Sequence, residues 1–444
     1  MGTSSITSDG RKILINQFKK SLDGDSDTYY LGLSGADSST AGLHDQMLAR
    51  NEMHFVKTIS ANSFVVETYD WISGTVYNQY DNNDTNRTQF YLSNGKNEVF
   101  ICIETGKTST GVANSSSVEP SSTLALAYDG LSRTFPTGDG YLWRYLYKMS
   151  GSSVNNFKTS EFMPVQKIVG SGVIAETIEQ SNLQTTAIAG EILGVAIVDG
   201  GSNYQFNPRI DLEGNGTGGT FVGTISDGKI VKIAADSDGF GRILHGSGYD
   251  YAKVFPSAGN AILRPIIAPS GGINKDPVAS LCAGKIMLQN TEGNVVPLAD
   301  PANDFKQVAL LRNLELADSA KTLLTAQIGT AMHSFTVSGG SGIFVADEIF
   351  ETPTQTRGKT FWHDNSNNRL YYVQNDSTGY GEFDVSGTIT SIATSTAKVV
   401  DAIIQPDFNR YSGDLLYINN LKDAIIKTGT QTEDFRIVID LGTK

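Results

Sequence analysis

Alternating apolar and polar positions predict short strands along most of the chain. The clearest strands are expected at residues 89–93, 96–103, 220–226, 229–234, 369–374 and 435–441. The first two flank Asn94-Gly95 and the next two flank Asp227-Gly228, and both pairs accept the positive φ angles of a tight turn. The pattern therefore predicts two β-hairpins.

Helical periodicity is confined to two short segments near the N-terminus. Ser8 or Asp9 is expected to cap a first helix that ends before Gly24, with an apolar face formed by Ile15, Phe18 and Leu22. A second helix is expected near residues 43–53. The fold class predicted is mainly β, a β-sandwich-like scaffold with few short helices and two small inserted β modules.

Shifts in composition suggest five segments. They are 1–188 (N-terminal scaffold), 189–275 (Gly-rich inserted module), 276–318 (middle scaffold), 319–401 (second inserted β module) and 402–444 (C-terminal scaffold). In the Gly-rich module, Gly201-Ser202-Asn203-Tyr204 is echoed by Gly246-Ser247-Gly248-Tyr249. Two echoes suggest a duplicated β unit but are fewer than the repeats of a solenoid.

The charge of the chain narrows the choice of partners. Its 444 residues carry a formal net charge of −13, and only 18% are charged, against about 25% in typical domains. Nucleic acids and anionic membranes are bound through basic surfaces, so we expect neither as a partner. Cys102 and Cys282 show no metal or disulfide spacing and are expected to be buried thiols, as in a reducing cytoplasm.

Sequence motifs that would indicate catalysis or the binding of a nucleotide or metal ion are weak. Residues 214–219 satisfy G-x-G-x-x-G, but the β-branched and aromatic residues that follow predict a strand, where a dinucleotide site needs a helix. The acidic run 23–27 lacks the glycine and glutamate of a calcium loop and predicts a solvated turn. The five histidines show no zinc spacing. We therefore expect no catalytic residue, no cofactor, no metal site and no enzymatic activity.

Residues 136–147 form an unusual aromatic run. Gly138-Asp139-Gly140 predicts a turn, and the strand after it places Tyr141, Trp143, Tyr145 and Tyr147 on one face. Such a ladder is either a core face or a protein contact. Aromatic stripes at strand period usually face inward, which favours the core.

This run resembles a Gly-Asp-Gly-Tyr-x-Trp-x-Tyr block in a baseplate wedge subunit of T-even-type contractile-tailed bacteriophages. Three more blocks follow the family's order: an Asp-Trp segment at 69–81, a Phe-Lys-Gln-aliphatic segment at 304–313, and a Ser-Gly-acidic segment at 412–417 with Gln-Thr-Glu at 431–433. The residues that carry the resemblance, expected in the scaffold or at an interface, are Trp71, Gly74, Tyr77, Gly138, Asp139, Gly140, Tyr141, Trp143, Tyr145, Phe305, Gln307, Arg312, Asn313, Gly413, Tyr417, Gln431 and Glu433.

The resemblance implies a structural role. The wedge subunit is a mainly β, non-enzymatic homodimer that contacts other wedge proteins and takes part in the baseplate rearrangement that triggers sheath contraction. Its place would be the virion tail baseplate, after assembly in the host cytoplasm. The Gly-rich echo and the aromatic residues leave an alternative open: a tail-associated β protein that binds or cleaves a host surface glycan.

Overall fold

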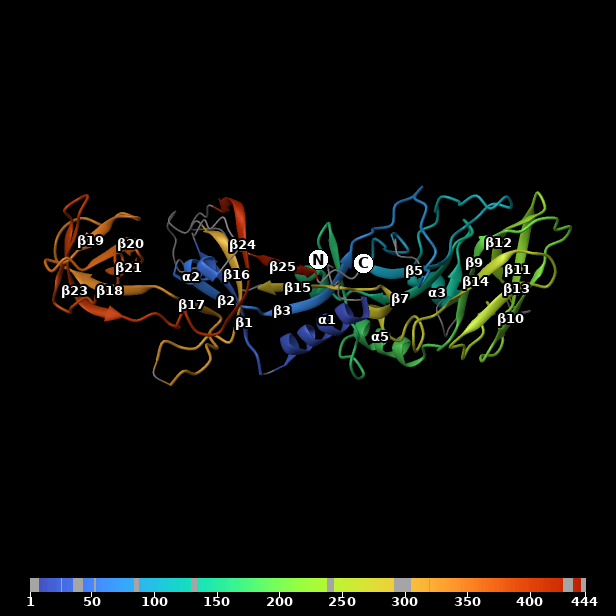
Figure 1. The fold of residues 1–444 in the computed structure, drawn as a ribbon, viewed down its shortest axis with the longest axis horizontal. Coiled ribbons are helices and arrows are strands. Elements are labelled where there is room, and N and C mark those ends of the chain that lie inside the picture. The colour runs from blue at the N-terminus through green and yellow to red at the C-terminus, as the bar shows by residue number, and fades with distance from the viewer. Residues whose placement is uncertain are drawn as a thin grey trace, which may run out of the picture. The chain divides into compact units, whose positions relative to one another are not determined.

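The computed structural model in Figure 1 describes residues 8–24, 26–34, 43–51, 53–83, 88–128, 134–237, 243–290, 305–318, 320–425 and 434–440. Strands make up 42% and helices 12% of the structure, which confirms the mainly β prediction. In this part of the chain no helix is long and apolar enough to cross a membrane.

The chain divides into two compact units. Unit 1 is built chiefly from Ser63–Met287, and unit 2 is built from Asn16–Asn62 and Leu288–Ile437. The predicted scaffold segments 1–188 and 276–318 each contribute residues to both units. The segment 189–275 lies wholly in unit 1, and the segment 319–401 lies wholly in unit 2.

Both predicted helices are present. Helix α1 (Ser8–Asp23) ends directly before Gly24 and buries Ile15, and α2 (Leu43–Asn51) ends where Met53 begins a strand. The sequence did not predict the other described helices, which are α3 (Ser122–Tyr128), α4 (Gly151–Phe157), α5 (Ala175–Thr185) and α6 (Pro277–Ser280).

Unit 1 contains a four-stranded sheet with the order β4-β5-β7-β6. Its strands are β4 (Tyr91–Ser93), β5 (Glu98–Glu104), β6 (Thr134–Pro136) and β7 (Leu142–Lys148). In β5 and β7 every residue but the last is buried, so both faces of these strands are covered. Helices α3 and α5 pack against β7.

The two predicted hairpins are present, and their turns differ. In the β4–β5 hairpin the residue with positive φ is Asn97, at +59°, and not Gly95. The loop between the two strands has four residues, and the strand register pairs Ser93 with Val99. The turn between β11 (Phe221–Ser226) and β12 (Lys229–Ala235) follows the prediction. Asp227 and Gly228 adopt φ of +49° and +71° there.

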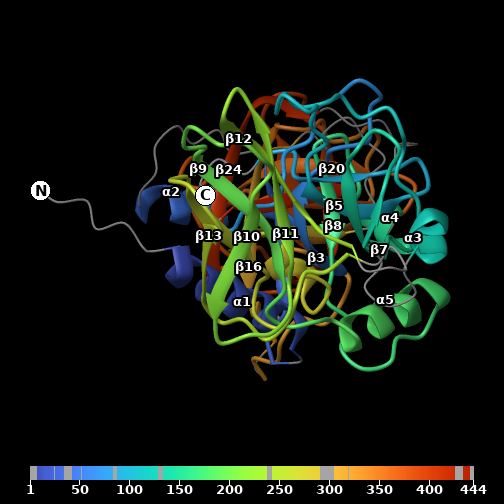
Figure 2. The same ribbon diagram turned by 90° about the vertical axis from the view of Figure 1, so that its right-hand side faces the viewer.

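The Gly-rich segment forms a four-stranded sheet, β12-β11-β10-β13, and a two-stranded sheet, β14-β9 (Figure 2). The remaining strands are β9 (Ile192–Asp199), β10 (Arg209–Gly214), β13 (Ala252–Pro256) and β14 (Ile262–Ile267). The echoed loops each bury a tyrosine, Tyr204 or Tyr249, in one shared core. They precede adjacent strands of one sheet and do not form two separate units.

The G-x-G-x-x-G loop is part of this packing. A Cβ at Gly216 would lie 2.4 Å from Cγ of Tyr249, so the glycine makes room for the ring. Strand β11 follows the loop, as predicted.

Unit 2 contains a five-stranded sheet, β17-β2-β1-β16-β24, and a closed barrel, β18-β21-β20-β19-β22-β23. The sheet strands are β1 (Tyr29–Ser34), β2 (Met53–Thr58), β16 (Phe305–Arg312), β17 (Ile328–Thr330) and β24 (Asp414–Ile425). The barrel strands are β18 (His333–Ser338), β19 (Ile349–Glu351), β20 (Arg357–Asp364), β21 (Arg369–Val373), β22 (Thr388–Ser391) and β23 (Ala397–Ile404). The rings of Phe335, Phe350, Tyr372 and Phe383 fill the barrel, and its closure leaves no open sheet edge.

A last sheet has the order β25-β15-β3-β8. Its strands are β3 (Ala61–Glu67), β8 (Phe162–Val165), β15 (Lys285–Asn290) and β25 (Phe435–Asp440). Strand β25 confirms the strand predicted near the C-terminus.

Candidate functional site

The aromatic run lies in the core of unit 1. Tyr141, Trp143 and Tyr145 are 0% exposed. Tyr141 stacks on Trp143 with ring centroids 5.4 Å apart, and Tyr77 meets the same indole edge-on at 5.5 Å. The core interpretation is confirmed, because a fully buried ring cannot contact a partner.

The tyrosine hydroxyls in this core hold neighbouring backbone. The Tyr141 hydroxyl donates to the carbonyl of Asn114 at 2.7 Å and accepts from the amide of Tyr77 at 3.1 Å. The Tyr145 hydroxyl donates to Glu179 on α5 at 2.9 Å. Burial raises the pKa of Tyr141 to about 12, so its hydroxyl stays protonated at neutral pH.

Asp139 ties the aromatic strand to a serine-rich loop. Its Oδ2 accepts hydrogen bonds from the amides of Ser117 at 2.8 Å and Val118 at 3.0 Å, and its Oδ1 accepts one from the Thr137 hydroxyl at 2.5 Å. Burial alone would raise the pKa of Asp139, but these hydrogen bonds outweigh it and hold the pKa below its usual value. The carboxylate is therefore a structural anchor.

The turn around Asp139 depends on one of its two glycines. Gly140 has a φ of +88° and donates its amide to the carbonyl of Thr137 at 2.9 Å. Gly138 has no positive φ and no neighbouring atom within 4 Å of a Cβ position.

The Asp-Trp block meets the aromatic block at Ser116. The indole Nε1 of Trp71 donates to the Ser116 hydroxyl at 3.1 Å, and that hydroxyl donates to Asp139 at 3.1 Å. Gly74, at a φ of +91°, donates its amide to the Ser116 carbonyl at 2.8 Å. Two blocks far apart in the sequence thus form one packed site.

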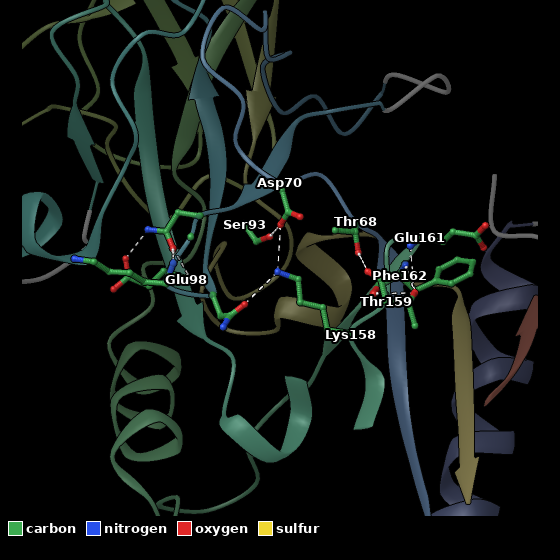
Figure 3. A network of polar contacts seen from close by, with 12 residues as sticks. Thr68, Asp70, Ser93, Glu98, Lys158, Thr159, Glu161 and Phe162 are labelled. Carbon is green, nitrogen blue, oxygen red and sulfur yellow. Dashed lines mark hydrogen bonds and ion pairs between the residues drawn. The ribbon is translucent and has the colours of Figure 1, made fainter. Parts of the chain in front are cut away.

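Asp70 belongs to a polar network beside this site, drawn in Figure 3. Its Oδ1 accepts from the Ser93 hydroxyl at 2.5 Å and from Lys158 Nζ at 3.2 Å. Lys158 also donates to Asn97, the residue with positive φ in the β4–β5 loop, at 3.1 Å. The network therefore fastens the hairpin to the segment after α4.

The middle and C-terminal blocks meet in unit 2, where β16 pairs with β24. Gln307 is 1% exposed; its amide donates to Asn420 at 2.7 Å and accepts from the Ser34 hydroxyl at 3.1 Å. The ring of Phe305 packs on that of Phe435 with centroids 5.5 Å apart. These side chains connect β16 with three other strands, β1, β24 and β25.

The other end of the same strand pair is fixed by charge and backbone geometry. Arg312 donates two hydrogen bonds to one oxygen of Asp414, at 2.6 and 3.0 Å. Asn313, at a φ of +55°, accepts from the amide of Thr28 at 2.9 Å. Gly413 has a φ of +62°, and a Cβ there would lie 2.3 Å from the Arg312 carbonyl oxygen.

Several described residues of these blocks are exposed; among the large apolar ones, Ile72 is 64% exposed and Leu416 is 44% exposed. Tyr417 on β24 is 55% exposed and is paired with Leu310 through the backbone. Gln431 and Glu433 lie outside the described residues.

A pocket of about 330 Å³ in unit 1 bears on the glycan alternative. It contains two carboxylates, Asp81 and Glu104, each paired with a cation: Asp81 with Arg264, and Glu104 with Lys232 at 3.5 Å. The lining, which contains no aromatic residue, is Asn78, Gln79, Asp81, Glu104, Lys107, Val195, Ala196, Ile197, Lys232, Ile233 and Ile266. Sugar sites usually stack rings on aromatic side chains, so this pocket does not support a saccharide-cleaving site.

A buried ion pair beside the aromatic core was not predicted from the sequence. Arg144 and Glu191 have side chains 2% and 4% exposed and share two hydrogen bonds of 2.5 and 2.9 Å. Strand alternation places Arg144 opposite the ladder, where an arginine is expected to face solvent. Only the fold shows that β7 is buried on both faces.

His245 lies beside that pair and is 5% exposed. Burial, and then the Arg144 charge, lower the pKa of His245 to about 4. The described residues contain no group of three or more His, Cys, Asp or Glu side chains that could hold a metal ion. Cys102 is buried as predicted, whereas Cys282 is partly exposed.

The sequence was also compared with known proteins. No family model matches it, and no curated protein matches it significantly.

Proposed function

We propose that the protein is a structural subunit of a phage tail baseplate wedge that acts through protein contacts. One observation carries this proposal: the four blocks that resemble the wedge family pair up in the fold. The two upstream blocks share Ser116 in unit 1, and the two downstream blocks form the β16–β24 pair in unit 2. Residues that are distant in sequence are thus used together to build a scaffold.

The chemistry of these blocks fits a scaffold. The Asp139 carboxylate, the Gln307 amide and the tyrosine hydroxyls all hold backbone or side chains of the same chain. In the proposed role, a homodimer of this chain holds neighbouring wedge proteins together. It moves as a rigid body when the baseplate rearranges and the sheath contracts.

Imaging of assembled tails tests the proposal. A peptide tag inserted at Ser377, an exposed residue in the turn after β21, would be labelled with an antibody fragment. Label around the hub at wedge positions is expected, and untagged tails serve as the control. Label found only at fibre tips, with no wedge neighbours, would refute the wedge assignment.

A further inference from the structure

The connection between β8 and α5 presents the most exposed large apolar side chains of the described chain. Val169 is 93% exposed and Val173 is 91% exposed. Two isoleucines next to them, Ile174 and Ile178, are 45% and 43% exposed. Single exposed apolar residues are ordinary, whereas these four lie within ten residues of sequence. We name residues 166–174 the valine loop.

Side chains of α5 hold the backbone of the valine loop in place. The amide of Gln184 accepts from the Ile168 amide at 2.9 Å and donates to the Ile168 carbonyl at 2.8 Å. The Ser181 hydroxyl donates to the carbonyl of Gly170 at 2.6 Å. Ser181 and Gln184 are each only 7% exposed. Their buried polar groups therefore form hydrogen bonds with the backbone of the valine loop.

Two further residues of α5 complete this support. The Thr177 hydroxyl accepts from the amides of Val173 at 3.0 Å and Ile174 at 3.1 Å. Gln180, 1% exposed, donates to the carbonyl of Gln166 at 2.6 Å. The four supporting side chains lie at i, i+3, i+4 and i+7 and therefore share one helix face.

Glycine brings the loop close to the helix. Gly172 has a φ of +73°, and a Cβ there would lie 2.5 Å from the carbonyl carbon of Thr177. The two valines are thus displayed on a backbone that is already fixed, which reduces the entropy lost when a partner binds.

Charges around the valine loop are already paired within the chain. Lys167 lies 2.9 Å from Asp276, and Lys148 lies 3.5 Å from Glu176. Residues 168–175 contain no charged side chain. A complementary partner is therefore apolar and uncharged, which excludes nucleic acid and disfavours an anionic membrane.

We propose that the valine loop is a docking knob that inserts Val169 and Val173 into an apolar pocket of a different protein. This rests on the proposed function, in which that protein is a neighbour in the baseplate. A second copy of this chain is the alternative occupant, and the cross-linking experiment below distinguishes the two. In Figure 2, α5 is at the lower right.

The test uses the full-length chain with Val169→Asp and Val173→Asp, produced in place of the wild type in cells that assemble tails. The matched control is Val198→Asp with Phe206→Asp, which changes two residues 64% and 65% exposed elsewhere in unit 1. We expect the first variant to melt like the wild type but to enter tails about tenfold less or worse. The control variant is expected to enter normally.

A photo-cross-linking residue at position 173 identifies the occupant in assembled tails. A cross-link to a different tail protein, lost when Val169→Asp is added to the cross-linking chain, is the expected result. Normal incorporation of the double variant, a cross-link to a second copy, or binding of the wild type to phosphatidylglycerol vesicles through the loop would each overturn the docking proposal alone. Absence of the chain from tails would overturn it together with the wedge assignment.

Discussion

Trp143 contributes to the aromatic core of unit 1 by packing and not by a hydrogen bond. The residue is 0% exposed, and its indole nitrogen has no hydrogen-bond partner among the described residues. Trp143→Ala should lower the free energy of unfolding by about 3–5 kcal/mol, because it leaves a large cavity. Trp143→Phe should cost clearly less, since no hydrogen bond is lost. Urea unfolding measures both, with the exposed residue Tyr251 changed to Ala as control; wild-type stability of Trp143→Ala would contradict this packing.

His245 should make the protein sensitive to mild acid. Its folded-state pKa is about 4 and its unfolded value is about 6.5, so the unfolded chain binds the proton more readily. The stabilising effect of the neutral ring is complete above pH 6.5 and is lost as the pH falls toward 4, by up to about 3 kcal/mol. His245→Gln should flatten this part of the stability profile. Equal acid sensitivity in the two proteins, measured by urea unfolding at each pH, would contradict it.

At the scale of elements, the two hairpin turns respond differently to the same change. Gly228 has a φ of +71°, whereas Gly95 has no positive φ, and the nearest atom to a Cβ at Gly95 is 3.8 Å away. Gly228→Ala should therefore destabilise the protein by about 1 kcal/mol, and Gly95→Ala should be neutral or slightly stabilising. Thermal unfolding of the two variants compares them directly. Equal losses would show that the turn conformations are alike.

The sequence predicted the elements whose pattern is local. The apolar face of α1 and the strands around Asp227-Gly228 depend on neighbouring residues alone, and both were predicted. The positive φ at Asn97 was not, because loop length depends on how β4 and β5 pair. The burial of Arg144 was not predicted either, since it depends on what covers the second face of β7.

At the scale of the whole molecule, the local sequence pattern does not predict that the barrel closes or which residues far apart in the chain pair with each other. The barrel closes because β18 pairs with β23, and Arg312 reaches Asp414 across 102 positions. Residues of the family-like blocks could be chosen from the sequence, but not the way in which they meet. The valine loop was also missed, since valines in a short apolar run normally predict a buried segment.

Most of unit 1 is one continuous stretch, Ser63–Met287, and we therefore predict that residues 61–290 fold without the rest of the chain. This fragment keeps β3 and β15 whole and contains the aromatic core and the Gly-rich sheets. A domain with its own core can fold independently.

Tryptophan fluorescence of the fragment tests this prediction. Trp71 and Trp143 both lie in the fragment, whereas Trp362 lies in unit 2, so the signal reports on unit 1 alone. We expect a cooperative urea transition with a blue-shifted native spectrum, and the fragment with Trp143→Ala as a destabilised control. A non-cooperative transition would show that unit 1 depends on unit 2 for its stability.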